Sequence, residues 1–297
     1  MTTVQQALFE VRQYAARRRR RQQLQKAGNV CRVTFILSLI VIFLLPFYIS
    51  FIYSIKYKNE VTADRLAWPQ HPTLSNYIRV ITENEQFLTG YKNSILTTIP
   101  TVLILLFVTS MAAWVLARYN TRFYNAMYTL FTLGILIPFQ CIMLPLYLNM
   151  SKANLTDTIY GFVFARAGLQ ISISLLVVTS FVKSVPRELE EAASIDGCNR
   201  FQTFWRVVFP LMTPINATQA VLNTLFVWND YNTAVVLLRD KAVRTLPLAQ
   251  IVYFNENTAE LNLAFAFFNM AVLPILILYL CLQKYVVSGI MAGAVKG

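Results

Sequence analysis

The sequence holds few charged residues, which make up 13% of its 297 positions. Soluble globular proteins carry about 25% Asp, Glu, Lys and Arg. A content this low, beside 56% hydrophobic residues, excludes an ordinary soluble domain and indicates that lipid is the main solvent. The appropriate structural unit is then the membrane span of about 20 apolar residues.

Histidine, glycine and cysteine are too few, or too scattered, for the common catalytic and metal sites. His71 is the one histidine, which excludes a histidine-based catalytic dyad or metal cluster. None of the nine glycines precedes a lysine, so there is no Walker A loop for ATP. The four cysteines form no C-x-x-C pair, which argues against a zinc site or a disulfide framework. We expect no catalytic residue, no metal and no cofactor in this chain.

Apolar segments long enough to cross a bilayer recur along the chain. The expected spans are residues 33–55, 93–117, 123–148, 161–182, 214–235 and 261–282. They predict an all-α, polytopic membrane protein with six transmembrane helices. The first span is longer than a signal-peptide core and no clear cleavage site follows it, so we expect an uncleaved anchor.

The placement of lysine and arginine predicts the orientation, because cytoplasmic loops carry an excess of these residues. The formal charge is +12, and an unbroken arginine run over residues 17–21 precedes the first span. No nucleic-acid-binding module follows this run. We therefore interpret it as a positive-inside flank, compatible with contact to anionic membrane lipid. Both termini are then cytoplasmic.

The chain divides into three parts on this topology. These are a basic cytoplasmic tail over residues 1–32, a first span with its outer loop over 33–92, and a core over 93–297. The outer loop contains Trp68-Pro69 and His71-Pro72, so we expect an irregular loop with a short helix near residues 74–81. The core includes a polar cytoplasmic loop over 183–213.

Two ionisable side chains fall within the expected spans, Arg166 and Asp230. Ion-coupled carriers place such groups along their pathway. One arginine and one aspartate at the outer margins make an implausible proton relay, which disfavours an ion-coupled secondary carrier. For Arg166 two interpretations stay open, snorkelling to the outer headgroups and lining a polar cavity.

The cytoplasmic loop begins with a strong helix signal. Pro186 suits the first helical position, where its missing N–H costs nothing. Glu188, Glu190 and Glu191 then fall in the first turns and favour the positive end of the helix dipole. Gly197 can take the left-handed conformation that ends such a helix.

A second short helix follows this corner. Asn199, with Gln202 three residues later, resembles a capping box for a helix over residues 200–209. Pro210 and Pro214 are expected to stop it and to restart the chain as the fifth span. These local signals alone leave open whether the segment is an ordinary connector or a docking surface.

Three stretches of this chain resemble one protein family. The cytoplasmic loop is similar to the EAA loop of binding-protein-dependent ABC importer permeases at Glu191-Ala192-Ala193, Asp196-Gly197 and Phe209-Pro210-Leu211. Two further stretches resemble the carbohydrate, maltose-type branch whose subunits end in G-A-V-K-G, namely Val227-Trp228-Asn229-Asp230 and residues 289–297. The resemblance covers about residues 76–297. Cys198 and Phe209 depart from the family's usual alanine and leucine without removing the helix-turn-helix pattern.

The resemblance implies a type I ABC importer permease fold in a bacterial inner membrane. It implies a homologous permease partner in a heterodimer, two ATPase subunits that hold ATP and Mg²⁺, and an extracytoplasmic solute-binding protein. It also implies a coupling helix that docks into a separate ATPase. The residues that it assigns to this coupling are Glu190, Glu191, Ala192, Ala193, Asp196, Gly197 and Pro210.

Polar and aromatic residues of the spans are possible sugar contacts. These substrate-path residues are Gln140, Arg166, Gln170, Asn223, Trp228, Asn229, Asp230 and Asn269. Asn and Gln can equally act as hydrogen-bonding contacts between helices in lipid. A carbohydrate is the expected cargo. The alternatives are a glycerol phosphate or polyol importer of the same type, an ion-coupled carrier, and a membrane enzyme or receptor.

Overall fold

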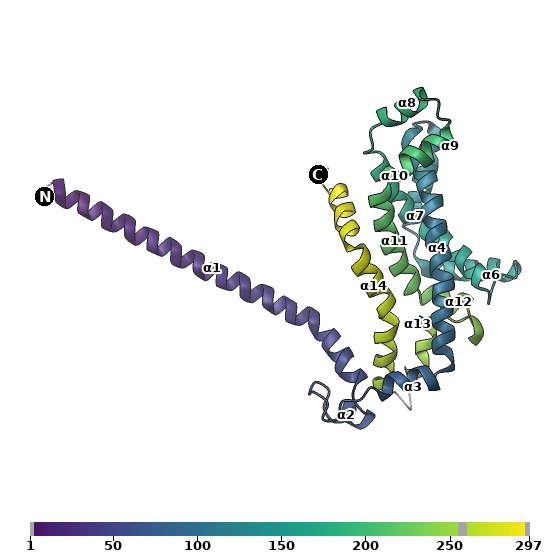
Figure 1. Cartoon of the computed structure of the whole chain (residues 1–297), viewed down its shortest axis with the longest axis horizontal. Helices are drawn as coiled ribbons and strands as arrows, with labels where there is room; N and C mark the ends of the chain where they lie inside the picture. The colour runs from purple at the N-terminus through teal and green to yellow at the C-terminus, as the bar shows by residue number, and fades with distance from the viewer. Residues whose placement is uncertain (1–2, 255–259, 295–297) are drawn as a thin grey trace.

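The computed structural model describes residues 3–254 and 260–294, which form helices and no β-strand. Long helices lie roughly side by side in Figure 1: α4 (Glu85–Arg118), α7 (Ile159–Val182), α11 (Thr213–Trp228) and α14 (Leu261–Ala294). α4 packs against α7 and α11, and α11 packs against α14. The C-terminal end of α1 (Thr3–Ser54) meets the bundle, where α1 contacts α14. The N-terminal part of α1 extends away from the bundle (Figure 1).

Short helices gather at the two ends of this bundle. The α3 end holds α2 (Lys58–Ala63), α3 (Ser75–Glu83) and α13 (Leu246–Ala249). The α8 end holds α8 (Glu188–Ile195), α9 (Arg200–Thr203), the π-helix η1 (Phe204–Val208) and α10 (Phe209–Leu211). The α11–α14 connection also contains α12 (Asn232–Leu237) and the 3-10 helices η2 (Lys241–Val243) and η3 (Gln250–Phe254). The expected short helix near residues 74–81 is confirmed as α3.

Four of the expected spans correspond to helices that are long and apolar enough to cross a bilayer. These are Cys31–Ser54 within α1, Glu85–Arg118, Ile159–Val182 and Leu261–Gln283 within α14. α5 (Arg122–Gly134) and α6 (Phe139–Lys152) make a fifth only if they count as one bent span. The described residues thus support four or five spans by length and composition, and the predicted count of six is not confirmed.

The expected span over residues 123–148 is not a single straight helix. α5 ends at Gly134, α6 begins at Phe139, and the two helices meet at 103°. Pro138 explains the break, because a proline disfavours helical backbone in the residue before it and donates no hydrogen bond itself. Pro138 has extended backbone (φ −62°, ψ 140°) at the start of α6.

The expected fifth span over residues 214–235 is also interrupted. α11 ends at Trp228, and a turn over residues 229–231 separates it from α12. Sixteen helical residues extend for about 24 Å, which is less than the ~30 Å of a hydrocarbon core. The asparagine and aspartate at 229 and 230 favour this turn, since their side chains compete for backbone hydrogen bonds.

Small and polar residues let α4 approach its neighbours. Ser94, Thr97 and Thr101 are buried, and each threonine hydroxyl donates to a carbonyl one turn earlier in its own helix. These hydrogen bonds satisfy the threonine hydroxyls within α4, so that no partner on another helix is needed. Gly90 faces α13, and an added Cβ would lie 3.2 Å from the Cβ of Ala249. The close packing that membrane helices need is therefore built from small side chains.

Candidate functional site

The α8 end carries a helical corner that projects beyond the main bundle (Figure 1). α8 begins at Glu188, so Pro186 lies before the helix. The sequence had predicted Pro186 at the first helical position. Arg187 takes the N-cap position, and its carbonyl accepts from the backbone N–H groups of Glu190 and Glu191. The glutamates of the first turn lie where the helix dipole favours negative charge.

Gly197 ends α8 as predicted. Its φ of +84° lies in the left-handed region, which glycine adopts without penalty. The N–H of Cys198 donates to the carbonyl of Ala193 at 2.9 Å, and that of Gly197 donates to Ser194 at 3.1 Å. This pair of bonds is the Schellman motif, which turns the chain sharply at a fixed angle.

The second helix of the corner has the predicted capping box. Asn199 accepts from the backbone N–H of Gln202, whose side chain accepts from the N–H of Asn199, both at 2.9 Å. The prediction that Pro210 stops this helix is wrong, because helical backbone continues through α9, η1 and α10 to Leu211. The chain widens into the π-helix η1 before the proline ring. This wider turn accommodates the missing N–H of Pro210.

Glu190 fastens α8 to the end of α4. Its carboxylate lies 2.6 Å from a terminal nitrogen of Arg118, and it accepts from the indole N–H of Trp114 at 2.9 Å. Arg118 also donates to the carbonyl of Val185 at 3.0 Å. The Arg118 and Glu190 side chains are only 10% and 14% exposed. Glu190 is thus engaged within its own chain, although the sequence groups it with the coupling residues.

The opposite face of α8 is open. Glu191, Ala192, Asp196 and Gly197 are exposed, and Ile195 is 86% exposed. Ala193, by contrast, is 7% exposed and faces the chain. A partner can thus reach Glu191 and Ala192, but it cannot reach Ala193. Pro210 is exposed further along the loop.

Sequence reasoning missed Ile195 and Phe201, two large apolar side chains exposed at this corner. Ile195 could have been found, because it stands four residues after Glu191 and therefore on the same helical face. It also missed Arg118 and Trp114. No local signal links these residues to Glu190, since the contact joins segments about seventy positions apart.

A core cluster connects this corner to the bundle. Phe204 of η1, Val208 and Met212 pack with Val178 and Val182 near the end of α7. The cluster also includes residues of α4 and α11. A displacement of the α8–α9 corner therefore acts on three long helices together, because close-packed interiors transmit strain.

Several predicted substrate-path residues form contacts between helices. Asn223 of α11 accepts from Gln170 and Ser174 of α7, at 3.2 and 3.1 Å. The indole N–H of Trp228 donates to the carbonyl of Ala271 on α14 at 3.0 Å. These side chains are buried within the chain. Their hydrogen bonds hold the bundle together.

Three other predicted substrate-path residues lie apart from these contacts between helices. Asn269 bonds to Ser50 of α1, and Asn229 bonds to the carbonyl of Leu225 in its own helix. Gln140 is exposed on α6. The eight predicted residues are therefore spread over several places and do not converge on one cavity.

Arg166 and Asp230 do come together. The Arg166 Nε lies 2.7 Å from the Asp230 carboxylate, and both side chains are nearly buried at 11% and 7% exposure. The carboxylate also accepts from the backbone N–H of Thr233 at 2.9 Å. The pair lines a pocket of about 480 Å³ beside the α5–α6 corner. Arg166 is thus paired with a carboxylate and lines a pocket.

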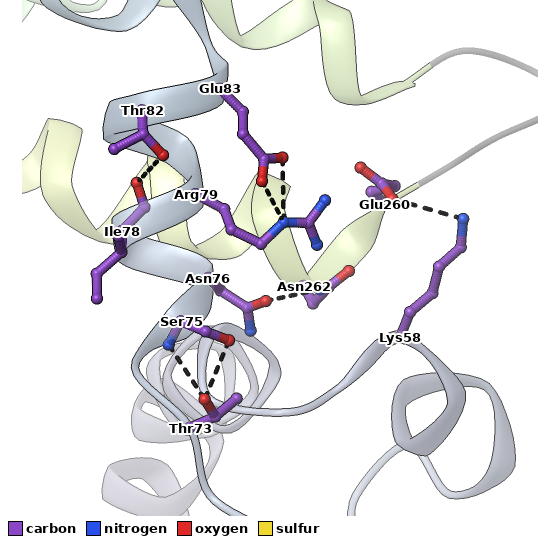
Figure 2. Close-up of polar contacts among 10 residues, drawn as sticks. All are labelled: Lys58, Thr73, Ser75, Asn76, Ile78, Arg79, Thr82, Glu83, Glu260 and Asn262. Atoms are coloured by element: carbon purple, nitrogen blue, oxygen red, sulfur yellow. Dashed lines mark hydrogen bonds and ion pairs between the residues drawn. The ribbon is translucent and has the colours of Figure 1, made fainter.

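The α3 end is held by a polar network (Figure 2). The Asn76 amide donates to the carbonyls of Ser54 and Lys56 at 2.9 and 2.8 Å, and Asn262 of α14 donates to Asn76 at 2.9 Å. This network joins α1, α3 and α14 at one point.

Ion pairs border this network at the same end. Arg79 pairs with Glu83 at 3.0 Å, and Lys58 lies 3.7 Å from Glu260 (Figure 2). The hydrogen bond from Arg79 lowers the pKa of Glu83 below its ordinary value.

Comparison with known proteins gives a consistent result. Residues 107–291 match the family described as "binding-protein-dependent transport system inner membrane component". The chain is 35% identical to the probable starch degradation products transport system permease protein AmyC of Thermoanaerobacterium thermosulfurigenes, over 84% of this chain and 91% of that protein. It is 34% identical to the melibiose/raffinose/stachyose import permease protein MelC of Bacillus subtilis (strain 168), over 85% and 91%.

A solved structure has a similar fold. It is a bacterial ABC transporter involved in the import of the acidic polysaccharide alginate. The TM-score is 0.77 at 26% sequence identity, and the alignment covers 88% of this chain and 96% of that chain. The likeness extends over nearly the whole described bundle.

Proposed function

This chain belongs to the family of binding-protein-dependent transport system inner membrane components, and we propose that it is the membrane-spanning subunit of an ATP-driven carbohydrate importer. In this proposal the α8–α9 corner receives energy from a separate ATPase. The chain itself is a multi-pass protein of the inner membrane that forms the passage for the cargo.

The observation that carries this proposal is the two-sided character of α8. Its inner side is fixed by the Glu190–Arg118 pair and by buried Ala193. Its outer side presents Glu191, Ala192 and Ile195 without cover from this chain. A helix that is rigidly held on one side and open on the other suits the transfer of force from a docked partner. Gly197 keeps the angle of this lever constant.

The partners follow from the same proposal. Two ATPase subunits bind ATP and Mg²⁺ at the α8 end, which is then cytoplasmic along with both termini. A homologous permease subunit completes a heterodimer around the passage, and an extracytoplasmic solute-binding protein delivers cargo to the α3 end. Six crossings satisfy this topology when α5–α6 is one bent span and the helical stretch from Arg200 to Trp228 is another.

A carbohydrate is the proposed cargo because the named relatives import or are assigned to starch degradation products and to melibiose, raffinose and stachyose. The pocket beside Arg166 and Asp230 supports this choice. Its two charges neutralise each other, so the pocket offers hydrogen bonds without a net charge, as an uncharged sugar requires. The other predicted path residues, Gln140, Gln170, Asn223, Trp228, Asn229 and Asn269, do not line this pocket.

Co-purification with the ATPase tests the proposal. We expect the chain to retain an ATPase subunit in mild detergent, and the complex to hydrolyse ATP faster when the sugar-loaded binding protein is added. Ile195→Asp places a charge on the open face of α8 and should abolish ATPase retention. Ile78→Asp, a matched exposed position on α3 that is 62% exposed, should leave it intact. Retention that is equal in both variants would contradict docking at α8.

A further inference from the structure

A polar pocket of about 630 Å³ opens at the α8 end, apart from the open face of α8. It lies between the end of α4, the start of α5 and the link from α7 to α8. Its polar lining includes Tyr119, Asn120, Asn125, Lys183, Arg187 and Glu188. The volume falls within the range of pockets that hold small molecules and headgroups.

The pocket carries a net positive charge. Arg118 also lines it, but Glu190 neutralises that guanidinium. Lys183 is exposed and lies over the Tyr128 ring at 4.9 Å, and no carboxylate of the described residues pairs with it. Arg187 and Glu188 add one charge of each sign. One positive charge is therefore left uncompensated.

Arg187 retains donors for a ligand. One terminal nitrogen donates to the carbonyls of Ala117 and Arg118, at 3.5 and 3.2 Å, at the C-terminal end of α4. Its other two nitrogens make no hydrogen bond within residues 3–254 and 260–294. Arg187 lines the pocket, and the planar fork of N–H donors on a guanidinium suits a phosphate.

The position of the pocket along the membrane-crossing helices indicates which kind of anion it binds. α4 ends at Arg118 and α7 ends at Val182, so both membrane-crossing helices end where the pocket opens. This is the level of the lipid headgroups. α5 extends from the pocket and exposes Phe123, Leu130 and Leu133, and it has no buried residue. An acyl chain can lie along such a surface, whereas a free phosphate gains nothing from it.

We propose that this pocket binds the phosphate headgroup of an anionic phospholipid, with Lys183 and Arg187 as its cations and the exposed apolar face of α5 beneath its acyl chains. Basic pockets between membrane helices are suited to such headgroups. A bound lipid joins the end of α4 to the link between α7 and α8. The inference rests on the chain spanning a membrane, and it needs neither the proposed cargo nor ATP.

Native mass spectrometry of the full chain, purified with its partner subunits, tests this site. The complex is exposed to phosphatidylglycerol or to zwitterionic phosphatidylcholine of the same chain length. We expect phosphatidylglycerol to be retained preferentially. Lys183→Gln should weaken its retention about fivefold, as expected for one cation near a membrane surface. Arg206→Gln, which removes an exposed cation at the same end but outside the pocket, should have little effect.

Glu188→Gln supplies a test of opposite sign. This variant removes the one carboxylate among the lining residues, so it should strengthen retention by a similar factor. A merely structural role of the pocket would not produce opposite effects at neighbouring positions. Equal retention of both lipids would overturn the proposal, as would equal losses in the Lys183 and Arg206 variants. Binding of inorganic phosphate without lipid retention would overturn the lipid assignment. None of these readouts depends on transport.

Discussion

At the residue scale, Glu190 and Glu191 are neighbours with different surroundings. Glu190 is directed inward onto Arg118 and Trp114, whereas Glu191 is exposed on a different side of α8. A helix places consecutive residues about 100° apart, which is sufficient to separate an internal contact from an external one. Of the two, only Glu191 is placed to contact an ATPase directly.

Substitution of each glutamate should therefore give a different defect. Glu190→Ala leaves the nearly buried Arg118 cation without its partner, and we expect a loss of about 3 kcal/mol in unfolding free energy. Glu191→Ala should change stability by less than about 0.5 kcal/mol, as at other surface positions, while it reduces binding-protein-stimulated ATP turnover. Thermal unfolding in detergent and ATPase assays separate the two. Equal destabilisation by both variants would contradict the inward role of Glu190.

Gly197 is the second residue whose effect can be stated. An added Cβ would meet no atom within 4 Å, so any cost arises from the backbone φ of +84°. Gly197→Ala should cost about 1 kcal/mol. Gly197→Pro also removes the hydrogen bond from the N–H of residue 197 to the carbonyl of Ser194. The proline ring in addition fixes φ near −65°. We expect the proline variant to insert and assemble but to hydrolyse ATP without uptake. Normal uptake by that variant would argue strongly against the lever.

The Arg166–Asp230 pair gives a third prediction. Arg166→Gln leaves Asp230 almost buried without its countercharge, and we expect a loss of about 3 kcal/mol in unfolding free energy. A double variant, Arg166→Met with Asp230→Leu, should regain most of that stability because no unpaired charge remains. A double-mutant cycle on thermal unfolding measures the coupling. Additive losses would show that the pair is not coupled.

At the element scale, α3 and its network hold the end opposite to α8. Asn76 and Asn262 tie α3 to α1 and α14, and the Arg79–Glu83 pair lies one turn apart along α3. Tyr253 of η3 closes the same region by accepting from Asn84 at 3.0 Å. A solute-binding protein that docks here would contact elements joined by these hydrogen bonds and this ion pair.

The Glu83 ion pair predicts a pH dependence for this element. Arg79 lowers the folded-state pKa of Glu83, so the stabilisation is present above the ordinary glutamate pKa of about 4.3. It is lost as the pH falls through the lowered folded-state pKa. Between pH 5 and 3 the wild-type chain should lose more thermal stability than Glu83→Gln. High salt should reduce the difference, because the pair is exposed. Identical pH profiles would contradict this.

The predictions of helix ends agree with the structure where the signal lies in a few adjacent residues. They differ from it where a proline's effect on a helix depends on the surrounding packing. The capping box at Asn199 and the left-handed Gly197 depend on a few adjacent residues, and both are present. Pro138 and Pro210 account for two differences between the predicted and the observed elements. The first breaks an apolar segment that is predicted as one span, and the second is accommodated by a π-helix. Whether a proline ends a helix depends on packing around it, which a single sequence does not contain.

The candidate site was predictable only in part for a related reason. The α8 corner could be identified as a unit because its residues are contiguous. The contacts of Glu190 with α4 and of Asn223 with α7 join distant segments. Polar residues within spans are ambiguous between a passage and a helix contact, since the same side chains serve both. Only Arg166 and Asp230 were brought together at a pocket.

At the scale of the whole molecule, the chain connects two ends by long helices. The α8 corner joins α4, α7 and α11 through one core cluster, and the polar network at the α3 end joins α1, α3 and α14. In the proposed function, a movement at the α8 end can thus reach the α3 end through these long helices. The proposal requires that ATP binding to the partner prefer one arrangement of these helices, since only a differential affinity shifts an equilibrium.

Uptake of radiolabelled sugar into proteoliposomes tests the central claim most directly. The vesicles contain the chain with its permease and ATPase partners, and loaded binding protein is added outside. We predict uptake that requires ATP and Mg²⁺ inside the vesicles, persists when ionophores collapse all ion gradients, and disappears with Ile195→Asp. Uptake driven by an ion gradient without ATP would contradict the account.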